Sequence, residues 1–95
     1  MTENVVDRVS VLVELYGVPR LRAERRTCQV EAASVAEAMA ALEAACPKLS
    51  GSVLVGGRLL PAYRLSLNGK SFVTDLATRL TPGDILILIA ADAGG

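Results

Sequence analysis

The sequence contains no histidine and only two cysteines, Cys28 and Cys46, which form no CxxC pair. Two isolated thiols cannot supply a zinc site, and a Cys–His nucleophile needs a histidine, so both kinds of site are excluded. We therefore expect no metal site. Free cysteine is among the most buried residue types, so we expect both thiols to lie in the core.

The sequence also has few aromatic residues and no net charge. The aromatic residues are Tyr16, Tyr63 and Phe72, so the core has to be aliphatic. Ten basic and ten acidic residues balance, which argues against nucleic acid as a partner, because phosphate binding needs a net basic face. The first residues do not resemble a signal peptide, and no apolar run is long enough to span a bilayer. The sequence therefore predicts a cytoplasmic protein with no membrane partner.

What the sequence has in abundance is aliphatic side chains. Hydrophobic residues make up 52% of its 95 residues, which is enough for one modest core and excludes a largely disordered chain. We expect a single domain over residues 1–95, with an N-terminal tail at 1–8 and a C-terminal tail at 90–95.

The first half of the chain predicts a hairpin followed by a helix. Apolar and polar residues alternate over 9–16 and 27–31, as in two strands, and an arginine-rich turn joins them. Ser34 and Glu37 form a capping box for a helix that ends near Cys46. Its core face should consist of Val35, Met39, Leu42 and Cys46. Residues 48–63 are expected to be a glycine-rich loop with one short edge strand, and they lack the helix start of a phosphate-binding loop.

The second half predicts another hairpin and a final strand. Asn68-Gly69 is a strong hairpin signal between strands at 63–67 and 70–73. The Pro82-Gly83 turn then leads into the apolar run 85–89, which is typical of a strand with both faces covered. The order hairpin, helix, hairpin and strand predicts an α+β fold. We expect a mixed sheet of four to five strands with one main covering helix, and the first and last strands should be neighbours at its centre.

One face of this sheet is expected to carry an aliphatic patch. If Leu86 and Leu88 face the helix, Ile85, Ile87 and Ile89 face away from it, near Leu12. A contiguous apolar patch usually marks an interaction site. The alternative is that the loop at 48–63 folds over it.

Small residues follow the last strand, and the sequence ends in Asp92-Ala93-Gly94-Gly95. Glycine permits close backbone approach, so a carboxylate carried by two glycines could enter another protein's nucleotide site and be activated as an acyl-adenylate. The alternative is an ordinary chain end.

Four features together resemble the ubiquitin-like β-grasp sulfur carriers of the MoaD/ThiS family, over about residues 9–95. They are the turn Leu67-Asn68-Gly69-Lys70, the turn Leu80-Thr81-Pro82-Gly83-Asp84, the apolar last strand and Gly94-Gly95. The resemblance implies a ubiquitin-like β-grasp fold. It also implies that an E1-like adenylyltransferase, using ATP and magnesium, adenylates Gly95. The adenylate would become a thiocarboxylate that donates sulfur to an acceptor synthase.

The resemblance implies that Gly95 is the acyl site. Gly94 would be the small neighbouring residue that lets the tail enter a narrow channel. The partner-binding residues would be Leu12, Ile85, Ile87, Ile89, Asp92 and Ala93. The sequence departs from the family at Ala90, where a proline is common, and at Asp92, in a segment that is commonly apolar. Its length fits the longer molybdopterin- and cysteine-type carriers better than the short thiamine-type carriers. We favour the molybdopterin type, with the cysteine and thiamine types as further possibilities.

The resemblance implies a carrier that is no enzyme by itself and binds no cofactor. Two alternatives share much of the evidence. One is a ubiquitin-like modifier joined through Gly95 to other proteins, which needs the same activation step. The other is a β-grasp binding module in which the tail has no role.

Overall fold

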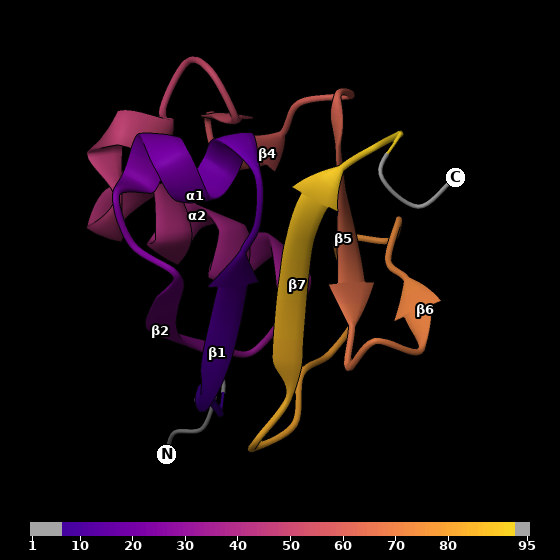
Figure 1. Cartoon of the computed structure of the whole chain (residues 1–95). Coiled ribbons are helices and arrows are strands. Elements are labelled where there is room, and N and C mark those ends of the chain that lie inside the picture. The colour runs from indigo at the N-terminus through magenta and orange to yellow at the C-terminus, as the bar shows by residue number, and fades with distance from the viewer. Residues whose placement is uncertain (1–6, 93–95) are drawn as a thin grey trace.

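The computed structural model describes residues 7–92, which form a five-stranded mixed sheet with a helix packed across one face (Figure 1). The sheet order is β2-β1-β7-β5-β6. β1 and β7 run parallel, and the other neighbours are antiparallel. The expected α+β fold, with the first and last strands adjacent in the centre, is confirmed. The strands are β1 (Val9–Leu15), β2 (Thr27–Ala32), β5 (Tyr63–Leu67), β6 (Ser71–Phe72) and β7 (Ile85–Ala90).

The covering helix α2 (Val35–Ala45) begins at the predicted capping box. The hydroxyl of Ser34 accepts a hydrogen bond from the Glu37 amide at 3.3 Å. The Glu37 carboxylate reaches back one residue further than in the usual box and accepts from the amide of Ala33 at 3.0 Å. The predicted core face is confirmed, because all four of its side chains are buried. They are Val35, Met39, Leu42 and Cys46.

The core lies between α2 and the sheet. On β1 the buried residues alternate with partly exposed ones, and on β7 the leucines are buried while the isoleucines are not. Both cysteines are buried, as predicted, at 2% exposure for Cys28 and 4% for Cys46. Among the residues described, no polar or charged side chain is buried. An aliphatic core of this kind is held by apolar burial.

A short helix occupies the arginine-rich segment that the sequence predicted to be only a turn. α1 (Val18–Ala23) is six residues long, with Pro19 in its first turn. Proline is tolerated there because the first helical amides have no intrahelical acceptor. Pro19 is buried, and the left-handed residue Glu24 ends the helix.

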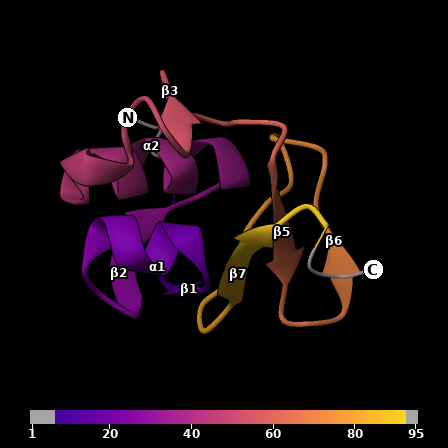
Figure 2. The ribbon, with the colours of Figure 1, turned by 45° about the horizontal axis from the view of Figure 1, so that its top comes forward.

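Residues 48–63 also contain more structure than the single edge strand that was predicted. A 3-10 turn, η1 (Pro47–Leu49), is followed by two short antiparallel strands, β3 (Leu54–Val55) and β4 (Arg58–Leu59). They pack against α2 (Figure 2), and the Gly57 amide donates to the Glu43 carboxylate of that helix at 2.6 Å. The segment therefore belongs to the helix layer and does not cover the opposite face of the sheet.

Residues 74–80 connect β6 to the last turn without forming a helix. Their carbonyl groups accept hydrogen bonds from the first amides of α2, from Val35 to Thr78 at 3.0 Å and from Ala36 to Leu76 at 2.9 Å. This loop therefore satisfies helix-end donors that would otherwise lack partners. Neither α1 nor α2, the two α-helices of the part described, is long and apolar enough to cross a membrane.

Candidate functional site

The last strand is held on both sides until it reaches the tail. β7 pairs with β1 along one edge and with β5 along the other, and its last residue, Ala90, lies opposite Tyr63. The amide of Ala91 donates to the carbonyl of Ala62 at 2.7 Å. The last strand therefore ends at Ala90, one residue beyond the predicted end at Ile89. Asp92 follows as an exposed residue, and the predicted site residues Ala93, Gly94 and Gly95 lie outside the described residues.

The side chains of β7 divide between the two faces as the sequence predicted. Leu86 and Leu88 face α2 and are fully buried, whereas the three isoleucines are partly exposed on the other face. Leu12 of β1 lies opposite Ile85 in the parallel register and is also partly exposed. The structure thus brings together four of the six predicted partner-binding residues, Leu12, Ile85, Ile87 and Ile89. Their role in partner binding stays a prediction.

Polar side chains border this apolar stripe on both sides. Ile87 lies between Glu14 of β1 and Ser66 of β5, and Arg64 lies opposite Ile89. The Tyr16 hydroxyl donates to the Glu14 carboxylate at 2.9 Å, and this bond raises the pKa of Tyr16. An apolar centre with a polar rim is the usual composition of a protein–protein interface.

Two of the four features that carry the family resemblance, the turns at 67–70 and 80–84, lie against each other at the start of β7. Asn68 and Gly69 both have positive φ angles, of 56° and 69°, as a tight hairpin turn requires. The Asn68 side chain donates to Asp84 at 3.0 Å and accepts from the Ile85 amide at 2.8 Å. Asp84 also accepts from the Thr81 amide at 2.8 Å. These bonds favour the ionised carboxylate and lower the pKa of Asp84, with the Asn68 bond as the largest cause.

No family model and no curated protein matches this sequence. Solved structures do match. Small archaeal modifier protein 1 from Haloferax volcanii is 29% identical, with a TM-score of 0.77 over 90% of this chain and 99% of that one. The BexX/CysO complex from Amycolatopsis orientalis gives 20% identity and a TM-score of 0.71, again over 90% and 99%. A putative molybdopterin converting factor, subunit 1, from Pyrococcus furiosus gives 19% and 0.70, over 86% and 97%.

The chain is a ubiquitin-like β-grasp protein. The similarity extends over most of its length and confirms the predicted β-grasp fold and the resemblance to the MoaD/ThiS family that the two turns, the last strand and the diglycine together indicate.

The described part of this β-grasp protein contains no candidate metal cluster. Within residues 7–92, no three His, Cys, Asp or Glu side chains come close enough to hold a metal ion. The polar groups beside the stripe are a carboxylate paired with a phenol and a guanidinium stacked on an aromatic ring. An apolar stripe with polar groups at its margins is suited to contact with another protein.

Sequence reasoning did not find the polar rim or the bonds between the turns. The sequence does contain a signal for the rim, because Glu14 and Arg64 occupy outward-facing positions in alternating strands. This alternation identifies a rim only when the strand order, which places both residues beside β7, is known. The bond between Asn68 and Asp84 has no local signal, since each residue fits its own turn without the other.

Proposed function

We propose that this β-grasp chain is a sulfur carrier whose Gly95 carboxylate is adenylated by an E1-like enzyme and converted to a thiocarboxylate. The observation that supports the proposal most directly is the place of β7. This central strand exposes an apolar stripe on the open face of the sheet and leads within a few residues to Gly94-Gly95. A partner docked on the stripe would be close to the start of the tail.

The proposed chemistry uses groups of the partner enzyme. An oxygen of the Gly95 carboxylate attacks the α-phosphorus of ATP, and pyrophosphate leaves. Hydrosulfide (HS⁻) from a sulfur donor then attacks the acyl carbon, AMP leaves, the sulfur loses its proton, and the thiocarboxylate remains. ATP and magnesium belong to the E1-like partner, which must stabilise the charge that develops on the phosphates. The carrier supplies a tethered reactive group, so its contribution is positioning and it is no enzyme alone.

We further propose that the stripe and the tail act as one recognition unit. Leu12 and the three isoleucines would dock on the partner, and Asp92 and Ala93 would follow the tail toward the partner's active site. The acceptor would be a biosynthetic synthase. We favour a molybdopterin-type synthase, with cysteine- and thiamine-type enzymes as further possibilities; the length of the chain fits the molybdopterin- and cysteine-type carriers better than the short thiamine-type carriers.

A second candidate is a protein modifier attached through Gly95 to lysine side chains. The specific observation in its favour is the 29% identity to small archaeal modifier protein 1. The adenylation step is the same for both functions. They differ in the group that accepts the activated end, which is sulfur for a carrier and an amine for a modifier.

Intact-protein mass spectrometry tests the proposal. The chain is purified from its own cells, or incubated with ATP, an E1-like enzyme and a sulfur donor. A shift equal to the exchange of one oxygen for sulfur, located at Gly95, is the expected result. Adducts on other proteins without this shift favour the modifier. Neither shift nor adduct under conditions in which the E1-like enzyme is active contradicts both functions.

A further inference from the structure

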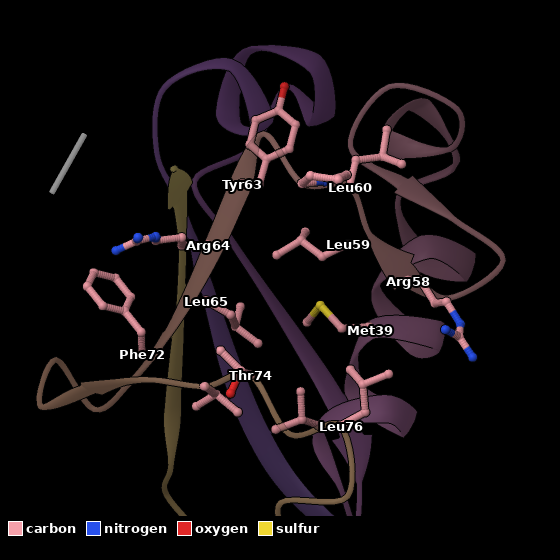
Figure 3. Close-up of a pocket in the computed structure, with 13 residues that line it drawn as sticks. Met39, Arg58, Leu59, Leu60, Tyr63, Arg64, Leu65, Phe72, Thr74 and Leu76 are labelled. Atoms are coloured by element: carbon pink, nitrogen blue, oxygen red, sulfur yellow. The ribbon is translucent and has the colours of Figure 1, made fainter. Parts of the chain in front are cut away.

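The two cysteines lie in the layer between α2 and the sheet, and the proposed function uses neither of them. The buried face of α2 runs along the sheet, and near its middle Met39 points toward the space beside Leu65 of β5 (Figure 3). Cys46 lies about two turns further along this face, at the end of the helix. Its amide donates to the carbonyl of Leu42 at 2.8 Å, which fixes its backbone relative to α2.

Cys28 faces the same core from the sheet. It is buried on β2, whereas the residues before and after it are exposed. α2 packs on β2, and both cysteines belong to one cluster of buried side chains. Burial raises the pKa of the Cys28 thiol, and so do the charge of the neighbouring Cys46 sulfur and a hydrogen bond between the two thiols. The two sulfur atoms are therefore neighbours in the core.

One guanidinium group contacts this pair. The Nε of Arg25 donates at 3.1 Å to the carbonyl of Thr27, which belongs to the peptide group that precedes Cys28. The Nη1 of the same side chain donates to the Sγ of Cys46 at 3.9 Å. Within residues 7–92 this guanidinium forms no ion pair with a carboxylate. A cation therefore lies beside the Cys46 sulfur, where it can pair with a thiolate.

The pair can be reached from the surface on the side of Cys46. Cys46 is buried, but Arg25, whose guanidinium contacts its sulfur, is an exposed residue. Exposed side chains change rotamer within picoseconds to nanoseconds. We therefore expect a small oxidant to reach Cys46 when Arg25 moves aside, without unfolding of α2. Cys28 should be reached later, because it lies on the sheet side of the pair.

We propose that Cys28 and Cys46 are a redox-modification site, at which hydrogen peroxide converts the two thiols to a disulfide. Cys46 loses its proton, and its thiolate attacks one peroxide oxygen. The O–O bond breaks, which leaves a sulfenic acid on Cys46 and a hydroxide ion that takes up the released proton. The Cys28 thiol then attacks the sulfenic sulfur, the S–S bond forms, and the hydroxyl group leaves as water with the Cys28 proton. The two thiols thus lose two electrons and two protons, and the peroxide is reduced to two molecules of water.

The disulfide would join the start of β2 to the end of α2. Such a cross-link restricts the unfolded chain, so the oxidised form should be more stable than the reduced form. A dithiol returns the pair to the reduced state by thiol–disulfide exchange. In a reducing compartment the pair would therefore stay reduced until an oxidant appears.

This proposal does not depend on the chemistry at Gly95. Cys28 faces α2, whereas the isoleucines of β7 lie on the other face of the sheet. The stripe therefore stays available in both redox forms. A sulfur carrier, a modifier or a binding module could each contain this site.

The test is oxidation of the folded full chain by hydrogen peroxide, followed by intact-protein mass spectrometry. We expect the loss of the mass of two hydrogen atoms and no thiol that reacts with N-ethylmaleimide in denaturant. Glu31, Glu37 and Glu43 lie between the two cysteines, so digestion at glutamate should leave the Cys28 and Cys46 peptides joined. The midpoint of thermal unfolding should rise by roughly 10 °C, and dithiothreitol should reverse the change.

Two alanine variants test the order of the steps. In Cys28→Ala the sulfenic acid has no second thiol to react with, so dimedone, which traps sulfenic acids, should label Cys46. In Cys46→Ala the remaining thiol is the less accessible one, and labelling should be at least about fivefold slower. Circular dichroism checks that both variants fold. Equal labelling of the two variants would contradict the role assigned to Cys46.

Three results would overturn the proposal. Persistence of both thiols, in a sample where glutathione added as a reference is fully oxidised, would show that the pair is not a site of oxidation. Disulfide-linked dimers on a non-reducing gel, or a gain of two oxygen atoms on one cysteine in place of joined peptides, would show that the two sulfurs do not meet in the folded chain. A lower unfolding midpoint after oxidation would show that the bond does not fit the native packing.

Discussion

The side chains of Asn68 and Asp84, sixteen residues apart in the sequence, are joined by a hydrogen bond of 3.0 Å. The backbone of Asn68 forms a second hydrogen bond to this turn, because its amide donates to the carbonyl of Ile85 at 2.7 Å. One residue thus connects the hairpin turn after β5 with the turn before β7. This connection fixes where the last strand begins, and therefore which of its side chains face the open side of the sheet.

Two substitutions at Asn68 separate its side-chain bonds from its backbone conformation. Asn68→Gly keeps the positive φ of 56° without strain and should lower the free energy of unfolding by about 1 kcal/mol, through the lost hydrogen bonds. Asn68→Ala should cost roughly 1 kcal/mol more, because alanine is strained in the left-handed region. Urea unfolding followed by circular dichroism measures both. Equal stability of the glycine variant and the parent would show that the side-chain bonds do not contribute.

Asp84 should make stability depend on pH in the acid range. Its hydrogen bonds hold its pKa in the folded state below the ordinary value of 3.8. A lowered folded pKa means that the carboxylate stabilises the fold above pH 3.8, and that this contribution is lost as the pH falls through the folded value. The stability difference between the parent and Asp84→Asn should therefore be constant near neutral pH and shrink below about pH 4.

Urea unfolding at a series of pH values measures this difference. Asp92→Asn is the matched control for the change of an acid to an amide, since Asp92 is exposed beyond the end of β7. A difference for Asp84→Asn that stays constant down to pH 2 would contradict the prediction.

Ile87→Asp should weaken docking of the activating enzyme. The change removes apolar burial worth roughly 1.5–3 kcal/mol and introduces a charge at the centre of the stripe. Isothermal titration calorimetry with the E1-like partner measures the loss. Val55→Asp is the matched control, because Val55 is 51% exposed on β3, in the helix layer. Unchanged binding of Ile87→Asp would show that this face is not the docking face.

The tail variants should lose activation and keep the fold. Removal of Gly95, or Gly94→Trp, should abolish ATP–pyrophosphate exchange by the E1-like enzyme, because the carboxylate is absent or the tail is too wide for a narrow site. Thermal unfolding should be unchanged, since the paired part of β7 ends at Ala90. Normal exchange with either variant would contradict the proposed role of the diglycine.

The elements that sequence reasoning found are those with strong local signals. The alternation over 9–16, the capping box at Ser34 and the turn at Asn68-Gly69 each depend on residues only a few positions apart. α1 was missed because six residues, with a proline in the first turn, are too few to show a helical period. β3 and β4 were missed because two residues each cannot show alternation, and their pairing is stabilised by packing on α2.

The candidate site was only partly predictable for the same reason. Alternation assigned Ile85, Ile87 and Ile89 to one face, and the parallel register then placed Leu12 beside them as expected. The polar rim of Glu14 and Arg64 depends on the order of three strands.

By itself, the sequence determined the local conformations, the aliphatic composition of the core and the small residues that follow the last strand. These follow from backbone sterics, side-chain periodicity and hydrogen bonds between near neighbours. Only the tertiary structure decided that Asn68 bonds to Asp84, that the 48–63 segment lies on α2, and that Glu14 and Arg64 border the β7 stripe. Those relationships bring together residues distant in the chain, and they form only when burial of the shared core offsets the entropy of closing the loops between them.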